Sequence, residues 1–334
     1  MKAIYFFGII SILLFSSCDQ DQQKIIIAFG SCSHENDSRQ LWEEIISYNP
    51  SAWIWMGDNI YGDTYDMEVM AAKYRMQKER PSYQQLISNT KIFGTWDDHD
   101  FGINDGGKEY PMKVESKALM LDFLDVPSND PVWEREGAYQ SYMIEQDDIK
   151  IKLILLDTRY FRDSLAININ RPPLYHPNDT GTVLGAAQWS WLEEELSNSA
   201  ADVHLIGSSY QLIPNDHGYE KWGNFPNERQ RFFDLIAKTN PARPIILSGD
   251  RHIAEFSKVD AAATGVPLYE FTSSGLTHTW STPREEKNEF RIGELIIERN
   301  FGIIVIRKSA KDIDIEFKVF GPANELWAST KAIF

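Results

Sequence analysis

Short runs of apolar residues recur along the chain, and several of them stop abruptly at residues that can do chemistry. The runs lie at 25–29, 52–56, 92–95, 152–156, 203–206 and 245–247. Short runs that are apolar almost throughout are typical of strands buried on both faces of a sheet. Such strands need partners and covering layers, so they constrain the fold more than any other feature of the sequence.

Helical periodicity fills several of the gaps between these runs. We expect helices at 38–48, 68–79, 82–88, 186–196 and 227–239. Strands that alternate with helices predict an α/β fold, and the last two runs, 301–307 and 313–319, predict an antiparallel hairpin that closes a sheet. Because the pattern shows neither an internal repeat nor a linker, we expect a single domain over residues 25–334.

The first residues predict a signal peptide of the lipoprotein type. Lys2 precedes an apolar run at 3–15, and two serines precede Cys18. The run is shorter than the ~20 residues that a membrane-spanning helix needs, and its end is similar to a bacterial lipobox, whose Cys becomes the lipidated N-terminus. We expect residues 1–17 to be removed, residues 18–24 to form a polar tether, and the exported protein to be anchored to a membrane through Cys18. An ordinary signal peptide is the alternative, and the periplasmic face and the cell surface both stay open.

The chain is strongly acidic. Lys and Arg number 33 and Asp and Glu 49, which gives a formal net charge of −16 at pH 7. An acidic surface repels phosphate backbones, and no run of Lys and Arg appears, so nucleic-acid binding is not expected. An anionic substrate would therefore need a local cation. The 43% of hydrophobic residues and the many aromatic residues exclude a disordered or coiled-coil protein.

Thiol, carboxylate, phenol and imidazole side chains gather just after four of the predicted strands. In open α/β sheets, ligands bind beyond the carboxyl ends of the strands. Each residue taken alone has an ordinary explanation as a turn, cap or surface residue, but their coincidence at four strand ends favours one site. The residues are Cys32, Asp58, Tyr61, Asp97, Asp98, His99, Asp250 and His252.

Several carboxylates brought this close cannot all ionise unless cations compensate their charge. Thiolate, phenolate, imidazole and carboxylate suit a trivalent iron-like ion, and an oxygen-rich pocket around Asp98 suits a hard divalent ion such as calcium. Two such ions can stabilise both the attacking and the leaving oxygen of an in-line displacement, so the residues predict phosphoester hydrolysis. Interpretations from other classes stay open: a glycan-binding protein or glycosidase, and a metal-binding lipoprotein without turnover.

Five segments resemble the alkaline phosphatase D (PhoD-like) metallophosphatases, relatives of purple acid phosphatases and calcineurin-like phosphoesterases. They are FGSC at 29–32, GDNIYGD at 57–63, TWDDHD at 95–100, LDTRYFR at 156–162 and SGDRH at 248–252. The resemblance covers nearly all of residues 25–334 and implies a four-layer α-β-β-α sandwich with metals at one sheet edge. Many members carry a β-sandwich region before the catalytic domain, and we expect none here because the first strand begins a few residues after Cys18.

The resemblance also implies an enzyme that releases phosphate from external phosphate esters, with a metal-bridging hydroxide as the nucleophile. Cys32, Tyr61 and His252 would bind an iron(III) ion, and Asp58 and Asp250 would be shared between it and a second metal, with one or more calcium ions implied. Preference for monoesters, or for diesters as in a phosphodiesterase or phospholipase, stays open. The oligomeric state also stays open.

By the same resemblance, Asp98 stands where the wider superfamily has an Asn ligand of the second metal. The resemblance places His99 at the position that would contact the phosphate and protonate the leaving oxygen. Whether Asp97 or Asp98 reaches the metal stays open. Asp100 is expected to orient His99, and Arg251, between two expected ligands, is expected to pack outward.

Two further residues are catalytic candidates with structural alternatives. Asn59 would donate its amide to a phosphate oxygen or cap the following turn. Arg159 would clamp an anionic oxygen bidentately or form a structural pair with an Asp. Tryptophans are expected mainly in the core, with a rim that stacks on substrate as the alternative; they are Trp53, Trp55, Trp96, Trp222 and Trp280.

Overall fold

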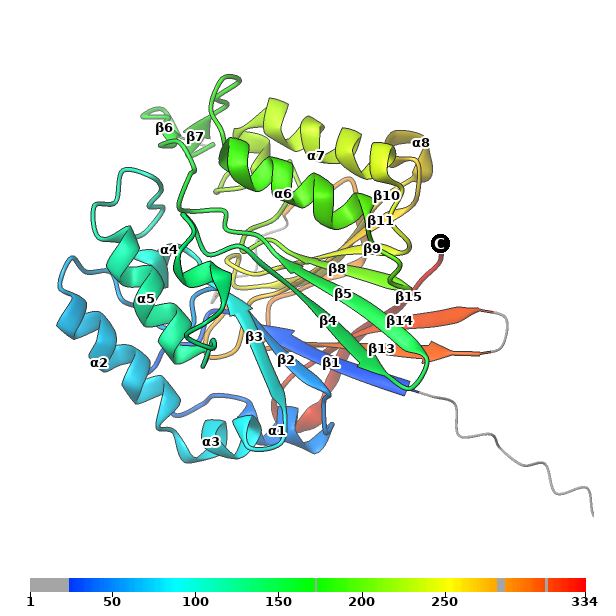
Figure 1. Ribbon diagram of the computed structural model, residues 1–334, viewed down its shortest axis with the longest axis horizontal. Helices are drawn as coiled ribbons and strands as arrows, with labels where there is room; N and C mark the ends of the chain where they lie inside the picture. The colour runs from blue at the N-terminus through cyan, green and yellow to red at the C-terminus, as the bar shows by residue number, and fades with distance from the viewer. Residues whose placement is uncertain (1–23, 172, 281–285, 310–311) are drawn as a thin grey trace, which may run out of the picture.

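Two large mixed sheets pack face to face in this computed structural model, which describes residues 24–171, 173–280, 286–309 and 312–334 (Figure 1). The first sheet has six strands in the order β15-β14-β13-β1-β2-β3, with β1, β2 and β3 parallel and β13, β14 and β15 antiparallel. Their bounds are β1 Lys24–Gly30, β2 Ala52–Met56, β3 Lys91–Thr95, β13 Phe301–Lys308, β14 Ile313–Phe320 and β15 Leu326–Ala332.

The second sheet has seven strands in the order β12-β10-β11-β9-β8-β5-β4. Its centre, β5, β8, β9 and β11, is parallel, and antiparallel strands flank it on both sides. The bounds are β4 Gln140–Gln146, β5 Ile149–Leu155, β8 Val203–Gly207, β9 Pro244–Ser248, β10 Ala254–Val259, β11 Leu268–Ser273 and β12 Arg291–Ile296. The strands β6 Ala166–Ile167 and β7 Tyr175–His176 form a separate small pair.

Helices cover the outer face of each sheet. The first sheet packs against α1 Trp42–Ser47, α2 Met67–Lys78, α3 Pro81–Ile87 and α5 Lys113–Phe123, and the second against α6 Gly185–Ser197 and α7 Pro226–Thr239. Figure 1 shows the two helical layers on opposite sides of the paired sheets. The shorter helices are α4 Asp98–Phe101, α8 Ala261–Thr264, η1 Pro131–Trp133, η2 Trp222–Asn224 and η3 Pro322–Asn324.

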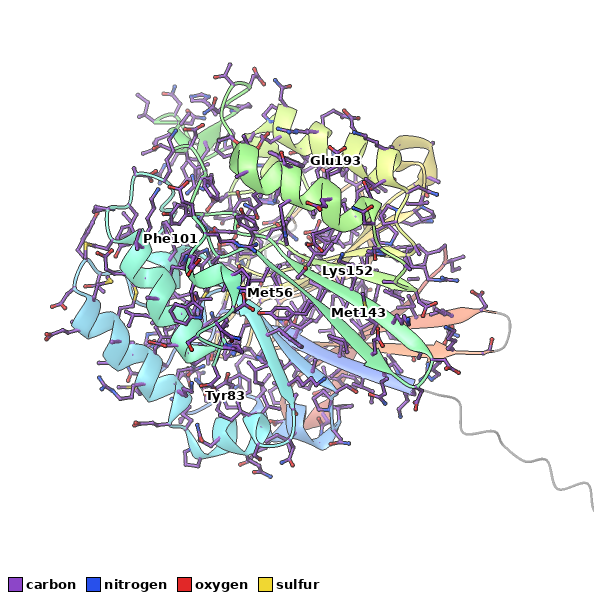
Figure 2. The ribbon with its side chains drawn as sticks, viewed as in Figure 1. Met56, Tyr83, Phe101, Met143, Lys152 and Glu193 are labelled. Atoms are coloured by element: carbon purple, nitrogen blue, oxygen red, sulfur yellow. The ribbon has the colours of Figure 1, made fainter. Side chains whose placement is uncertain are left out.

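Three apolar cores hold these four layers together. The core between the sheets joins residues such as Ile54 of β2 and Leu205 of β8, both fully buried. Met56, at the carboxyl end of β2, belongs to this core, whereas Tyr83 of α3 packs in the outer core of the first sheet (Figure 2). Burial on both faces is why these strands are apolar throughout. The expected α/β fold with a four-layer α-β-β-α sandwich is confirmed.

The structure differs from the sequence prediction at the first helix and at the end of the chain. The helix expected from residue 38 begins only at Trp42, because the Asp37 side chain accepts hydrogen bonds from the backbone and side chain of Arg39 and holds a turn there. The expected hairpin of β13 and β14 is confirmed, and β15 extends it by one strand.

The predicted signal peptide and Cys18 lie outside the described residues, as does the tether except for Lys24. In the part of the chain that the structure describes, no helix is both long and apolar enough to cross a membrane.

Tryptophan side chains fill the layer between the first sheet and its helices. Trp53 and Trp55 of β2 meet Trp42 of α1 with ring centroids 5.2 Å apart in each pair, and all three are buried. Trp96 and Trp222 are also fully buried, so the core interpretation holds for four of the five tryptophans expected there. Trp280 is the exception, with 37% of its surface exposed.

Candidate functional site

The loops after β1, β2 and β9 bring a thiol, a carboxylate, a phenol and an imidazole together at one edge of the paired sheets. Cys32 Sγ and Tyr61 Oη each lie 3.4 Å from Asp58 Oδ2, and Tyr61 Oη lies 3.2 Å from His252 Nε2. The donor atoms of Cys32, Asp58 and His252 all fall within 4.8 Å of one another. The side chains expected to bind an iron-type ion therefore converge.

The backbone is left-handed at four of the expected ligands. The φ angles are 59° at Cys32, 49° at Asp58, 65° at Asp250 and 54° at His252. Residues other than Gly seldom adopt positive φ, and such conformations cost roughly 1–3 kcal/mol each. Left-handed conformations therefore recur at the ligand positions, as is typical of functional sites.

Two glycines let the strand-end loops approach one another. Gly57 has φ +88°, and a Cβ on it would lie 2.4 Å from the Cβ of Asp97. A Cβ on Gly249 would lie 2.4 Å from Ser31 Oγ and 2.6 Å from the Met56 carbonyl oxygen. Because no side chain fits at either place, both glycines are required by the close approach of the loops.

Asp98 belongs to three of the four donor groups within the described residues that could hold a metal. One group joins Asp98 to Asp58 and His99, and another joins it to Asp97 and Asp250. Asp97 appears only once, and its Oδ1 accepts hydrogen bonds from the Arg159 Nε and Ser209 hydroxyl at 2.6 Å each. Asp97 Oδ2 is buried without a hydrogen-bond partner among the described residues, so the geometry keeps both Asp98 and Asp97 as candidates for the second-metal ligand.

A further group joins Asp98 to Asp105 and Glu220, two residues that the sequence pattern did not single out. Asp105 donates its backbone N–H to Asp98 Oδ2 at 2.6 Å. Burial raises the pKa of Asp105 to about 7, and the nearby Glu220 charge adds to this effect. No strand-end motif marks either residue in the sequence, because each lies in a long connecting loop.

The His99 ring is held by a carboxylate that is distant in sequence. Its Nδ1 lies 2.7 Å from Asp63 Oδ2, and its ring centroid is 4.4 Å from that of Tyr61. Burial opposes the charged form of His99, but Asp98, Asp58 and Asp63 outweigh it and raise its pKa to about 11. These carboxylates favour the protonated form of His99, which is the form that an acid catalyst needs before it reacts.

The expectation that Asp100 orients His99 is wrong. Asp100 Oδ1 accepts the backbone N–H groups of Asp97 at 2.7 Å and Asp58 at 3.1 Å, and its Oδ2 accepts that of Asn59 at 3.2 Å. Asp100 therefore fixes the loop that carries Asp58, and Asp63 is the residue that orients His99.

Arg159 forms a structural pair with an Asp, which was the alternative to its expected role of clamping a substrate oxygen. The clamp is not supported. The side chain is fully buried, its Nε donates to Asp97 at 2.6 Å and its Nη1 donates to Glu220 at 2.7 Å. Its guanidinium also lies over the Tyr210 ring, 5.0 Å from the centroid. Arg159 therefore positions the carboxylates behind Asp98 and does not face the cavity.

Asn59 is also turned away from the expected substrate contact. Its side-chain nitrogen donates to the Thr95 carbonyl oxygen at 3.1 Å, and the residue is fully buried. This contact ties the loop after β2 to the end of β3, so Asn59 supports the site from behind.

His278 is a second imidazole at the centre that was not expected from the sequence. Its Nε2 lies 3.0 Å from Tyr61 Oη, and its ring centroid lies 4.4 Å from that of His252. The signal was present in the segment FTSSGLTHTW at 271–280, in which the His follows the end of β11. His278 can orient the phenol or serve as an additional ligand.

The donor atoms fit the cations that the sequence predicts. Burial raises the pKa values of Cys32, Asp58 and Tyr61 well above their usual ranges, and burial together with the His278 charge lowers that of His252 to about 3. Asp58 Oδ1 is buried without a hydrogen-bond partner among the described residues. A bound cation would explain both the shifted pKa values and the unpaired Asp58 oxygen. It stabilises the anionic forms of the thiol, phenol and carboxylate, and it binds a neutral imidazole.

A cavity of about 260 Å³ opens beside these donors. It is lined by Asp98, His99, Asn104, Asp105, Leu174, Tyr219, Glu220, Asp250, Arg251, His252 and Trp280. The expectation that Arg251 packs outward is wrong, because only 2% of its surface is exposed and it forms part of this wall.

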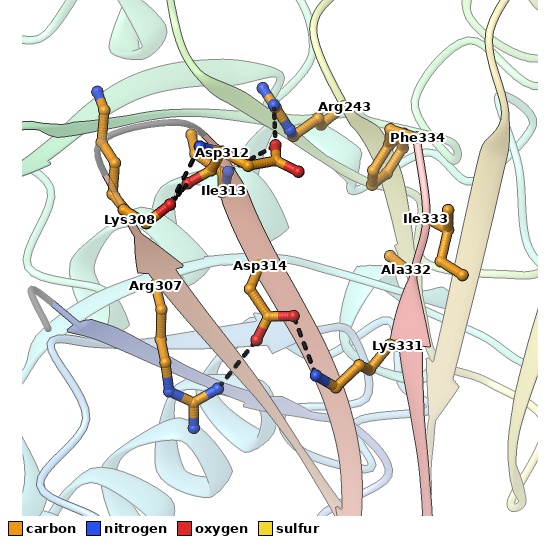
Figure 3. Close-up of a pocket in the computed structure, with 11 residues that line it drawn as sticks. Arg243, Arg307, Lys308, Asp312, Ile313, Asp314, Lys331, Ala332, Ile333 and Phe334 are labelled. Carbon is orange, nitrogen blue, oxygen red and sulfur yellow. Dashed lines mark hydrogen bonds and ion pairs between the residues drawn. The ribbon is translucent and has the colours of Figure 1, made fainter.

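A second cavity, of about 230 Å³, lies at the opposite end of β1, where Arg243 and residues at the ends of β13, β14 and β15 line it (Figure 3). Its charges pair with one another. Arg243 contacts Asp312 at 3.0 Å, and Asp314 contacts both Arg307 at 3.4 Å and Lys331 at 3.2 Å. None of the clustered donor side chains lines this second cavity, whereas Asp98, Asp250 and His252 line the first, so the first cavity remains the candidate site.

The four-layer sandwich with donor side chains at the strand ends is the fold of the metallophosphoesterases. Residues 149–304 match the family model described as PhoD-like phosphatase. The solved structure titled "Structure of PhoD" superposes with a TM-score of 0.71 at 17% identity, covering 93% of this chain and 68% of that chain. The protein TT1561 of Thermus thermophilus superposes with a TM-score of 0.42 at 10% identity, covering 88% of this chain and 98% of that chain. No curated protein matches.

The superposition with PhoD shows the fold. The family match over residues 149–304 supports a PhoD-like phosphatase and indicates a hydrolase of phosphoric esters.

Proposed function

We propose that the protein is an extracytoplasmic, metal-dependent hydrolase that releases phosphate from phosphate esters. The observation that carries the proposal is the convergence of Cys32, Asp58, Tyr61 and His252 within hydrogen-bonding distances at the strand ends. Soft, hard and imidazole donors in one buried cluster are the set that an iron(III) ion accepts. They are also difficult to explain as a structural network, since burial disfavours every anionic member.

The chain would hold two kinds of cation. Cys32, Tyr61 and His252 would bind the iron(III) ion, Asp58 and Asp250 would be shared, and a calcium ion would take oxygens including those of Asp98. When bound, such cations lower the pKa of water and neutralise phosphate oxygens.

His99 would protonate the leaving oxygen of the ester. Its Nδ1 is taken by Asp63, which leaves Nε2 as the nitrogen that can face a substrate in the cavity. Cations that neutralise Asp58 and Asp98 would lower the pKa of His99 from about 11 toward the working pH, where an acid catalyst is most effective. Arg159, Asp100 and Asn59 would act through the residues they hold.

The test is hydrolysis of p-nitrophenyl phosphate and bis-p-nitrophenyl phosphate by the mature protein with iron and calcium supplied, and with metal content measured in parallel. Asp58→Asn should abolish hydrolysis and reduce metal content. Preference for the monoester supports a phosphatase, and preference for the diester supports phosphodiesterase or phospholipase-like activity at the same centre. A protein that contains both metals and cleaves neither ester would refute the proposal.

Metal binding without turnover is the second candidate, and His99 separates it from catalysis. His99→Ala should keep the metal content in either case, because Cys32, Asp58 and His252 remain. Only an enzyme loses rate, by roughly 100-fold or more for a general acid.

Export and anchoring rest on the sequence pattern before residue 24 alone. Radiolabelled palmitate should label the full chain and be lost in Cys18→Ser, which should also leave the membrane fraction. If the wild-type chain takes up no palmitate label, the lipid anchor is refuted while the phosphoesterase proposal is unaffected.

A further inference from the structure

The cavity beside the metal donors is acidic, which is an obstacle for a phosphate ester. Four of its lining residues are carboxylates, namely Asp98, Asp105, Glu220 and Asp250. Arg251 is the only Lys or Arg among the described residues that line it. An anionic substrate that enters this cavity therefore meets one permanent cationic side chain.

Arg251 is held firmly on two sides. Its Nη2 donates to both oxygens of Glu286, at 2.7 and 2.9 Å, and its guanidinium lies over the Tyr219 ring, 4.4 Å from the centroid. Its backbone carbonyl accepts the Trp280 indole N–H at 2.8 Å. Because Arg251 lies between Asp250 and His252 in sequence, its backbone is fixed by the same turn that presents two expected ligands.

The remaining donors of Arg251 have no partner among the described residues. Nε and Nη1 are both buried, and only 1% of the side chain is exposed. A buried donor left unpaired is destabilising, and in native structures such a group usually has a bound partner or a function. Because Arg251 lines the acidic cavity, an oxygen that arrives with the substrate is a partner that would satisfy these two nitrogens.

We propose that Arg251 binds a non-bridging oxygen of the substrate's phosphate group and is a substrate-binding, specificity-determining residue. This inference rests on the proposed function. Arg donates to phosphate oxygens in a planar arrangement, and here Glu286 and Tyr219 hold that plane before the substrate arrives. A phosphate monoester carries more negative charge than a diester, so Arg251 favours monoesters and inorganic phosphate.

The experiment compares Arg251→Gln with the wild-type protein, both loaded with iron and calcium. We measure kcat and KM for p-nitrophenyl phosphate and bis-p-nitrophenyl phosphate, and the inhibition constant of inorganic phosphate. Loss of one charge-assisted hydrogen bond predicts a fall of roughly 10- to 100-fold in kcat/KM for the monoester. The fall for the diester should be smaller, the phosphate inhibition constant should rise in parallel with the monoester loss, and metal content should be unchanged.

Arg229→Gln is the matched control. Arg229 also stacks on an aromatic ring, with its guanidinium 4.7 Å from the Phe233 centroid, and donates to the Leu212 carbonyl, but it does not line the cavity. It should leave phosphate inhibition unchanged. Arg251→Lys keeps the charge and loses the planar donors, so it should fall between wild type and Arg251→Gln, and it carries the test if the Gln variant does not fold.

The outcomes separate the two proposals. If the wild-type protein holds its metals but neither cleaves an ester nor binds phosphate, the proposed function fails. If it cleaves the monoester, and the Arg251 variants match it in phosphate inhibition and in the ratio of monoester to diester activity, only the role of Arg251 is overturned.

Discussion

Glu270 of β11 offers a quantitative test of the electrostatics of the second sheet. The carboxylate is 1% exposed and accepts backbone N–H groups of Leu212, at 3.1 Å, and Ile213, at 2.5 Å. Burial raises its pKa from 4.5 to about 7 in spite of these hydrogen bonds. Since each pKa unit corresponds to 1.36 kcal/mol, this shift amounts to about 3 kcal/mol.

The sign follows from proton release. Below pH 4.5 Glu270 is protonated in both states, so it contributes nothing to the pH dependence. Between pH 4.5 and about 7 the unfolded chain releases the proton while the folded chain keeps it, so unfolding becomes easier as the pH rises. Glu270 therefore lowers the free energy of unfolding progressively across this window, by about 3 kcal/mol in all, and its contribution is constant above it.

Glu270→Gln removes this titration while keeping an oxygen for the two backbone donors. Denaturant unfolding of both proteins at several pH values from 4.5 to 7.5, with metals held constant, gives the difference in unfolding free energy. As the pH rises through this range, the unfolding free energy of Glu270→Gln should increase by about 3 kcal/mol relative to that of the wild-type protein. Contributions from the metal centre are the same in both proteins and cancel in the difference. Glu294→Gln, at an exposed position of β12, should give parallel curves. Parallel curves for Glu270→Gln as well would refute the argument.

Two more predictions concern the centre. Asp63→Asn should preserve metal content and lower kcat about 10-fold, because releasing the His99 ring removes part of what a positioned acid contributes. The same variant should lower the pKa of His99, so the alkaline limb of the rate profile should move to lower pH. The control Asp147→Asn, in an exposed turn, should leave both kcat and the pH profile unchanged. Removing metal with EDTA should lower the melting temperature, because Asp58, Asp98 and the other clustered carboxylates lose their compensating charge, and iron with calcium should restore it. A melting temperature indifferent to EDTA would count against a metal centre.

Strands buried on both faces were predictable, and strands with polar side chains were not. The strand β2 is fully buried and reads as a continuous apolar run. By contrast, β10 carries Glu255, a buried carboxylate to which Arg291 of β12 donates at 2.6 Å. A charged residue neutralised by a partner 36 positions away looks like a surface residue in sequence, so neither strand was expected.

The donor residues of the site were predictable because they follow strand ends. The orientation of the neighbouring side chains was not predictable. Asp100 is adjacent to His99 in sequence, yet the turn of α4 directs it to backbone N–H groups. Asp63 reaches His99 from another loop. Arg251 lies between two left-handed residues and lines the cavity, a placement that only the folded structure reveals.

The donors come from both sheets, and this division affects the order of events during folding. Cys32 and Asp58 follow strands of the first sheet, whereas Asp250 and His252 follow β9 of the second. A growing polypeptide cannot complete the centre until residue 252 has emerged and both sheets have docked. Uptake of the proposed cation would therefore report a finished tertiary structure. A nascent or clipped chain that stops short of His252 would be unable to retain the cation, even with β1, β2 and β3 already formed.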